Sequence, residues 1–312
     1  EIKAETKKKT TRKTAKKKTK SGYSTNAEVL ESLSNKHPIV PLIIEYRTFT
    51  KLNSTYVEGL LKEVEADGRV RSVFKQTETR TGRISSTEPN MQNIPVKKEI
   101  GRNMRKFFVS EDGYTLLDAD YSQIELRVLA SVCGDENMQA AFKDGKDIHR
   151  STAAQVFDLP EDFVTPEMRS AAKAVNFGIV YGISDFGLAN QIGVSNKKAK
   201  EYIQQYLEKY SGIKHFMDDI VESAKQKGYV ETLFGRRRYI PEIKSSNYMV
   251  RQFGNRVAMN TPIQGTAADI MKIAMINVKN ALQESKIHAK IVLQIHDELL
   301  LEVALQDKEK AK

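Results

Sequence analysis

The stretch Leu117-Asp118-Ala119-Asp120-Tyr121-Ser122-Gln123-Ile124-Glu125-Leu126-Arg127 decides the fold, because its periodicity changes in the middle. Residues 114–121 predict a strand, on which side chains two apart project from the same face, so Asp118 and Asp120 share a face. Residues 122–132 predict a helix that begins with the capping box Ser122-x-x-Glu125. Asp120 therefore stands at a strand–helix junction, where it either caps the helix or binds a ligand.

A second acidic motif, Gln294-Ile295-His296-Asp297-Glu298, separates two apolar runs and places Asp297 177 residues after Asp120. Residues 290–303 therefore predict two strands joined by a tight turn. Two adjacent carboxylates at such an apex are costly unless a cation is present. Magnesium prefers a few carboxylates plus substrate phosphates. Asp120 and Asp297 could together supply the carboxylates. Two such ions are the usual machinery of phosphoryl and nucleotidyl transfer.

A helix lies between the two motifs, because Thr165-Pro166-Glu167 has a cap residue followed by proline in the first turn. Four side chains then recur at four-residue spacing and form one slowly winding stripe: Arg169, Lys173, Phe177 and Tyr181. A core stripe would be apolar throughout, and a solvated stripe would not end in two aromatic rings. Cations suit a triphosphate and rings suit a stacked base, so the stripe predicts a nucleotide site.

The net charge of +10 is concentrated at the start of the chain, where residues 1–20 hold ten Lys or Arg against two Glu. We interpret residues 1–20 as a disordered, lysine-rich linker, with contact to nucleic acid phosphates as the alternative.

The single cysteine, Cys133, excludes an internal disulfide and a CxxC zinc site. No apolar run approaches about 18 residues, so no membrane span is expected. The cysteine content fits a cytoplasmic protein.

The remaining segments complete an α+β pattern. The prediction is of helices over 27–61 broken near Pro38 and Pro41, a strand over 70–76, turns over 77–95, mostly helix over 135–227, a hairpin over 229–240, and a helix over 248–280 interrupted at Thr261-Pro262. The simplest architecture is a small antiparallel sheet. The chain would leave this sheet, form a helical subdomain and then return to the sheet. Arg236-Arg237-Arg238 is interpreted as a solvated turn. Neither His149 nor Arg83 by itself indicates a function.

Seven sequence blocks resemble, in order, those of the family A DNA polymerases, over roughly residues 21 to 303. The blocks are Thr81-Gly82-Arg83-Ile84-Ser85-Ser86 with Pro89-Asn90-Met91-Gln92-Asn93-Ile94-Pro95, the stretch Asp120 to Arg127, Gly145-Lys146-Asp147-Ile148-His149, the stretch Lys173 to Gly182, Gly228 to Arg238, Gln264-Gly265-Thr266-Ala267-Ala268-Asp269 and His296-Asp297-Glu298.

This resemblance implies an α+β right-hand polymerase fold with an antiparallel palm sheet, a large helical fingers insertion and a partial helical thumb. The implied division after the linker is a partial thumb at 21–62, palm at 63–126, fingers at 127–255 and palm again at 256–312. The matching family members extend further at both ends, so the sequence is interpreted as a fragment, with no exonuclease in this chain.

The implied activity is template-directed addition of a deoxynucleotide to a primer 3′-hydroxyl by a two-metal mechanism, with release of pyrophosphate, in DNA repair and replication. The implied catalytic residues are Asp120, Asp297, Glu298 and Lys173, with two Mg²⁺ (or Mn²⁺) held by Asp120, Asp297 and the Tyr121 backbone. The implied dNTP-binding residues are Gln123, Glu125, His149, Arg169, Lys173, Phe177 and Tyr181. The implied contacts to primer–template DNA are Arg83, Arg256, Asn260, Gln264 and His296. The implied state is a monomer in the bacterial nucleoid.

Single residues carry further implications of the resemblance. Glu125 would be the steric gate against a ribose 2′-hydroxyl, Lys173 the proton donor to the leaving pyrophosphate, and Tyr181 the guard of the template position. Phenylalanine at position 177 implies discrimination against dideoxynucleotides. Three alternatives stay open: a single-subunit RNA polymerase, against which Glu125 argues, a non-catalytic primer–template binding module, and a two-metal phosphatase or nuclease, which would leave the stripe unexplained.

Overall fold

The computed structural model describes residues 18–19, 22–95 and 99–312. Contacts divide the chain into two compact units, Glu1–Arg71 and Ser72–Lys312, which are described separately. Most of the linker predicted at 1–20 lies outside the described residues, but β1 (Lys18–Thr19) pairs antiparallel with β2 (Gly22–Tyr23). Within the described ranges, no helix is both long and apolar enough to cross a membrane.

The unit that ends at Arg71 is mostly helical. Its helices are α1 (Ala27–Ser32), α2 (Ile39–Lys51), the π-helical segment η1 (Leu52–Glu58) and α3 (Gly59–Lys62). Pro38 precedes α2, as predicted, but Pro41 does not break it. Pro41 lies in the first turn, where a backbone N–H has no partner within the helix, so its missing N–H costs no hydrogen bond.

The unit that begins at Ser72 contains an antiparallel sheet in the order β5-β9-β8. Its strands are β5 (Tyr114–Asp120), β8 (Ala289–Ile295) and β9 (Glu298–Ala304). Two smaller hairpins are β3 (Val73–Lys75) with β4 (Ser85–Thr87) and β6 (Tyr229–Glu231) with β7 (Arg237–Tyr239). The strands predicted at 114–121, 290–303 and 229–240 are confirmed. The strand predicted at 70–76 is shorter, and the turns predicted at 77–95 contain the strand β4, whose sequence Ser-Ser-Thr carries no apolar alternation.

The long connection between β5 and β8 is helical. Its elements are α5 (Ile124–Cys133), α6 (Glu136–Lys143), α7 (Ile148–Phe157), η3 (Glu161–Phe163), α8 (Pro166–Val180), α9 (Asp185–Ile192), α10 (Asn196–Lys209), α11 (Ser211–Lys227), η4 (Pro241–Lys244) and α12 (Tyr248–Glu284). Shorter elements elsewhere are η2 (Met91–Asn93), α4 (Glu99–Arg105), η5 (Leu305–Asp307) and α13 (Lys308–Ala311). The unit is therefore a mixed α+β structure that is mostly helical.

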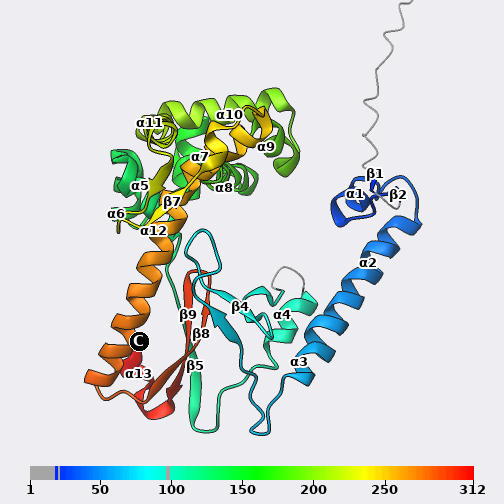
Figure 1. Cartoon of the computed structure of the whole chain (residues 1–312), viewed down its shortest axis with the longest axis vertical. Helices are drawn as coiled ribbons and strands as arrows, with labels where there is room; N and C mark the ends of the chain where they lie inside the picture. Colours follow the sequence, from blue (N-terminus) through cyan, green and yellow to red (C-terminus); the bar gives the residue numbers. More distant parts are fainter. Residues whose placement is uncertain (1–17, 20–21, 96–98) are drawn as a thin grey trace, which may run out of the picture. The chain divides into compact units, whose positions relative to one another are not determined.

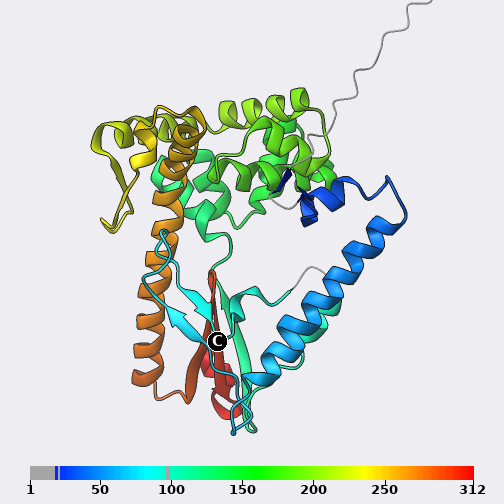
Figure 2. The ribbon, with the colours of Figure 1, turned by 45° about the vertical axis from the view of Figure 1, so that its right-hand side comes forward.

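Helix α12 contributes to both the helical core and the core beneath the sheet. Ile263 and Ala267 pack into the core of α5–α11, whereas Met271 packs against Leu299 and Leu301 of β9. Figures 1 and 2 both show helices α5–α11 gathered around the first half of α12 and the sheet beside its second half. The helix thus holds the helical region and the sheet together.

The predicted interruption of α12 at Thr261-Pro262 is wrong, because the helix runs unbroken from Tyr248 to Glu284 with Pro262 inside it. Proline in a helix interior removes one hydrogen bond and crowds the preceding turn. Every residue from Thr261 to Ala268 is buried. Packing on all sides of this segment therefore holds the helix where the local sequence would favour a break.

Candidate active site

Acidic side chains meet where β5 ends beside the turn between β8 and β9. The pairing register places Asp120 opposite Glu298, and the backbone N–H of Tyr121 donates to the carbonyl of Asp297 at 3.0 Å. Directly opposed residues of an antiparallel pair have Cβ atoms roughly 5 Å apart. His296 closes the turn with a left-handed φ of 54°. Two segments far apart in the sequence thus present their carboxylates at one sheet edge.

Burial and mutual repulsion together raise the pKa values of two of these carboxylates. Partial burial raises the pKa of Asp120, and the nearby charges of Asp297 and Asp118 raise it further. Burial likewise raises the pKa of Glu298, with the same acidic neighbours adding to the effect and Arg105 opposing it. The site is therefore rich in negative charge that a cation would stabilise.

The donor set fits magnesium better than a structural metal. In the ranges 18–19, 22–95 and 99–312, no three His, Cys, Asp or Glu side chains are arranged as a protein-only metal cage. Magnesium usually binds one or two carboxylates and completes its shell with water and substrate phosphates. Asp120 and Asp297 supply the two carboxylates of that requirement.

Helix α8 carries the predicted stripe of cations and rings. It begins as expected, because the Thr165 hydroxyl accepts a hydrogen bond from the Met168 N–H at 3.3 Å. Arg169 donates from Nε to Asp147 at 2.8 Å, and Lys173 Nζ lies 6.0 Å from the centre of the Phe177 ring.

Histidine 149 joins this stripe from helix α7. Its ring centre lies 5.6 Å from that of Phe177, and its side chain is 2% exposed. Burial lowers the pKa of His149 to about 4, and Lys173 and Arg169 lower it while Asp147 opposes. The imidazole is therefore neutral at neutral pH. Although burial alone would raise it, the pKa of Asp147 is held below its usual value by hydrogen bonds from Arg169 and backbone N–H groups.

Glutamate 125 is buried between two donors instead of capping its helix. Its Oε2 accepts from the Tyr181 hydroxyl at 2.8 Å and its Oε1 from Arg83. The predicted capping box is wrong, because α5 begins after Gln123, which has a left-handed φ of 57° and makes no side-chain cap. Burial and the Glu125 charge both raise the pKa of Tyr181, whose hydroxyl also interacts with Gln264.

Three of the predicted DNA contacts share one face of α12, since Arg256, Asn260 and Gln264 are four residues apart. Arg256 lines a cavity of about 480 Å³ together with Phe177 and Tyr181. The structure thus brings most of the predicted residues into three groups: the sheet-edge carboxylates; Arg169, Lys173 and Phe177 with His149; and Glu125 with Arg83, Tyr181 and Gln264. Among the described residues, the first two groups make no hydrogen bond or ion pair with each other.

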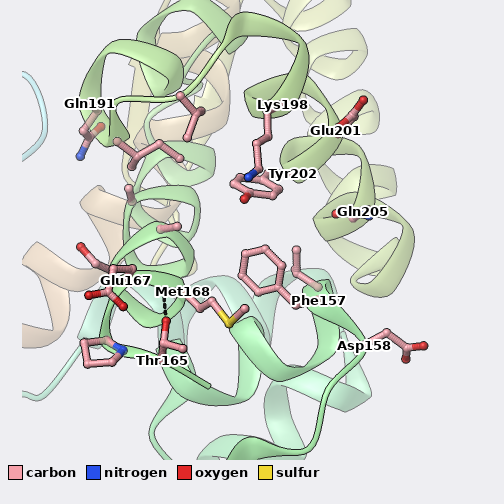
Figure 3. Close-up of a pocket in the computed structure, with 17 residues that line it drawn as sticks. Phe157, Asp158, Thr165, Glu167, Met168, Gln191, Lys198, Glu201, Tyr202 and Gln205 are labelled. Carbon is pink, nitrogen blue, oxygen red and sulfur yellow. Dashed lines mark hydrogen bonds between the residues drawn. The ribbon is translucent and has the colours of Figure 1, made fainter. Parts of the chain in front are cut away.

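A larger cavity of about 1040 Å³ lies elsewhere, between the end of α7, the start of α8 and helices α9 and α10 (Figure 3). Phe157 and Tyr202 pack edge to face at 5.1 Å on its wall, and Lys198 lies 5.7 Å from the Tyr202 ring. None of the predicted site residues lines it. The predicted site residues Phe177, Tyr181 and Arg256 line the smaller cavity instead.

Arginine 236 is the main residue that the sequence interpretation missed. Its Nε donates to Asp269 at 2.8 Å, and its Nη2 donates to the carbonyls of Thr81 and Gly265 at 2.8 and 3.0 Å. The interpretation of residues 236–238 as a solvated turn is thus wrong for Arg236, which ties the loop before Arg83 to α12. One sequence signal pointed to the ion pair of Arg236 with Asp269, namely the acidic residue at the end of the block Gln264–Asp269.

Comparison with known proteins places these features in a family. Residues 4–312 match DNA polymerase family A. The chain belongs to DNA polymerase family A. It is 56% identical over 297 residues to DNA polymerase I of Caldicellulosiruptor bescii, covering 95% of this chain and 35% of that protein. It is 54% identical over 296 residues to DNA polymerase I of Geobacillus stearothermophilus, covering 94% and 34%.

A solved polymerase-domain structure has the same fold. The POL domain of Pol1 from M. smegmatis, in complex with DNA primer-template and dNTP, matches with a TM-score of 0.89 and 46% sequence identity, over 95% of this chain and 52% of that chain. The chain spans about a third of the length of the curated relatives it matches.

Proposed function

We propose that this chain is the polymerase part of a DNA polymerase I and extends a primer on a DNA template. The observation that supports this most directly is the register of the sheet, which sets Asp120 opposite Glu298 with Asp297 in the adjoining turn. The family membership and the relatives' names support the same proposal. Primer replacement and gap filling in DNA repair and replication would be its roles.

In this proposal the palm comprises residues 63–126 and 256–312, the fingers 127–255 and the partial thumb 21–62. The β5-β9-β8 sheet supports the palm assignment, because its strands come from both palm segments. The helices between β5 and α12 support the fingers assignment, since they share one hydrophobic core. The compact units divide after Arg71 rather than after residue 62.

Asp120, Asp297 and the Tyr121 carbonyl would hold two magnesium ions, with manganese as a substitute and Glu298 alongside. When bound, these ions would lower the pKa of the primer 3′-hydroxyl and offset charge on the leaving pyrophosphate. The raised pKa values of Asp120 and Glu298 support this role, because they reflect partial burial of these carboxylates together with repulsion from their acidic neighbours.

The α8 stripe would bind the incoming nucleotide. Arg169 and Lys173 would contact the triphosphate beside His149, Phe177 would stack on the nucleotide, and Gln123 would lie next to it. Lys173 would also donate a proton to the leaving pyrophosphate. The ion pair between Arg169 and Asp147 supports this arrangement, because it holds the guanidinium in place before substrate binds.

Glu125 would exclude a ribose 2′-hydroxyl, and Tyr181 would occupy the template position until a template base enters. Their hydrogen bond, with Arg83 on the other carboxylate oxygen, supports a rigid wall at this point. Arg256, Asn260, Gln264, His296 and Arg83 would contact primer–template DNA. Contacts to the degenerate minor-groove acceptors would check pair geometry without reading sequence.

Primer extension tests the proposal. A labelled primer–template with four dNTPs and Mg²⁺ would be extended by the wild-type chain and by Asp219→Asn, a control on the exposed side of α11. Asp120→Asn and Asp297→Asn are expected to lose extension while they keep duplex binding. Extension that survives either change would refute the assigned carboxylates. Duplex binding without extension by the wild-type chain would favour a non-catalytic binding module.

A substitution of Glu125 tests the alternative hypothesis that the chain is a single-subunit RNA polymerase. Glu125→Ala is expected to incorporate ribonucleotides more readily than the wild type. An unchanged preference would remove the argument against an RNA polymerase.

A further inference from the structure

A fully buried polar chain runs behind His149. Asn176, Thr152 and Tyr210 each have 0% exposure. Asn176 Nδ2 lies 3.1 Å from His149 Nδ1 and 3.1 Å from Thr152 Oγ1, and Thr152 Oγ1 lies 3.2 Å from the Tyr210 hydroxyl. This chain links α7, α8 and the end of α10, and the proposed function gives it no role.

The hydrogen-bond requirements of Asn176 determine its amide orientation. In the observed orientation, the two N–H groups of Nδ2 meet two acceptors, His149 Nδ1 and Thr152 Oγ1, and Oδ1 lies 3.4 Å from the Thr152 hydroxyl. A flipped amide would point its NH₂ group at Thr152 alone and leave one N–H without an acceptor. An unsatisfied buried donor costs roughly 1–3 kcal/mol. The observed orientation is therefore the stable one.

We propose that Asn176 is a positioning residue that keeps the proton of His149 on Nε2, so that the imidazole offers a neutral N–H donor to the nucleotide triphosphate. An Asn176 N–H that points at Nδ1 requires a lone pair on that nitrogen, which leaves Nε2 as the protonated atom. Protonation of Nδ1 would set two donors against each other. This inference rests on the proposed role of His149 in nucleotide binding.

The charges around His149 show why a neutral donor is useful. Arg169 and Lys173 face it from α8 and Asp147 from the start of α7. On the other elements packed against α7, Glu161 of η3 binds Ser151, Tyr210 reaches Thr152, and Lys146 lies near Asp144. An imidazolium beside the two cations would repel them, whereas a neutral ring adds a third donor to the triphosphate without that repulsion.

Nuclear magnetic resonance of the chain labelled with ¹⁵N-histidine tests the tautomer without any activity. The sequence has five histidines, and a His149→Gln variant assigns the signal of His149 by its loss. The expected result is a protonated Nε2 and an unprotonated Nδ1 across neutral pH. A protonated Nδ1 in the wild type would overturn the proposal.

Two variants test the control of the tautomer by Asn176. Asn176→Asp replaces the donor with an acceptor of the same shape and is expected to move the proton to Nδ1. Thr152→Val removes the acceptor of the second amide N–H and is expected to populate both tautomers. Asn190→Asp, on an exposed position of α9, adds the same charge as a control and should leave the wild-type pattern. A wild-type tautomer in a folded Asn176→Asp chain would contradict the proposal.

Nucleotide binding supplies the functional readout. In Asn176→Asp the new carboxylate beside Nδ1 would raise the pKa of His149 from about 4 toward neutrality. Above the raised pKa the variant would present a bare Nε2 lone pair to the triphosphate, and below it the imidazolium would restore the donor. The KM for dNTP of Asn176→Asp is thus expected to rise about tenfold between pH 6 and pH 8.5, relative to Asn190→Asp, at the low end of what a hydrogen bond to a charged group contributes. If the KM for dNTP depended on pH in the same way for Asn176→Asp and Asn190→Asp, the proposed contact between His149 and the triphosphate would be overturned. If the wild-type chain has no polymerase activity, the proposed function fails while the tautomer experiment still decides the role of Asn176.

Discussion

Replacing Arg236 with methionine is expected to lower the free energy of unfolding by about 3 kcal/mol. The change leaves the Asp269 carboxylate, whose side chain is 12% exposed, without its ion-pair partner. Breaking a fully buried pair costs roughly 3–5 kcal/mol, and the one-third exposure of Arg236 places this pair at the lower end. The carbonyls of Thr81 and Gly265 lose a shared donor as well.

Urea denaturation followed by circular dichroism would measure this loss for Arg236→Met, Asp269→Asn and the double variant. Because the two side chains contact each other, their effects should be non-additive by at least about 1 kcal/mol. Arg237→Met is a matched control, since Arg237 pairs with Glu231 at 2.7 Å but both side chains are exposed, and it should cost less than about 1 kcal/mol. Equal losses for Arg236→Met and Arg237→Met, or strict additivity with Asp269→Asn, would refute the reasoning.

Three further outcomes are expected. Gly254→Ala should destabilise the chain by several kcal/mol or prevent folding, because its Cβ would lie 2.7 Å from the backbone nitrogen of Ile243, and urea denaturation would measure the loss. Tyr181→Phe should lower the free energy of unfolding by about 1 kcal/mol, because the buried Glu125 carboxylate loses a donor. For His149, the folded pKa of about 4 lies below the unfolded value of 6.5. The unfolded chain therefore binds more protons between these pH values, so stability should fall as the pH drops from about 6.5 toward 4, and His149→Gln should flatten this dependence.

The expectations for Tyr181 and His149 each have a control variant that shares their chemistry. Tyr239→Phe removes a hydroxyl from a side chain that is 69% exposed and should leave stability unchanged. His215→Gln removes an exposed histidine and should leave the pH dependence intact. A Gly254→Ala chain as stable as the wild type would show that η4 can move away from α12. A Tyr181→Phe loss no larger than that of Tyr239→Phe would contradict the role of the Glu125 hydrogen bond.

Local patterns predicted the elements that carry the site, because those elements depend on near neighbours in the sequence. Thr165 and Pro166 specify the start of α8 by capping and by a fixed φ, and the structure starts the helix there. The apolar runs on either side of Asp297 specify two strands by their composition, and β8 and β9 match them. These predictions needed no knowledge of the rest of the chain.

The errors at Glu125 and Pro262 came from residues whose partners are distant in sequence. Glu125 fits a capping box by its spacing, but Arg83 and Tyr181, 42 and 56 residues away, bind its carboxylate instead. Pro262 reads as a helix break, but burial on every side keeps α12 intact. In each case tertiary contacts outweigh a local preference worth about 1–3 kcal/mol.

Asn176 shows why a motif can hide a positioning residue. On the helix it lies three residues after Lys173, on a neighbouring strip of the helix surface, and its fully buried side chain contacts His149 and Thr152 of α7. From sequence it reads as a polar residue in a helix interior, where asparagine is unfavourable. Its cost is recovered by His149 and Thr152, which satisfy both of its N–H groups. A polar residue placed against its local preference, one turn from substrate-binding side chains, is thus a reason to look for the functional group that it orients.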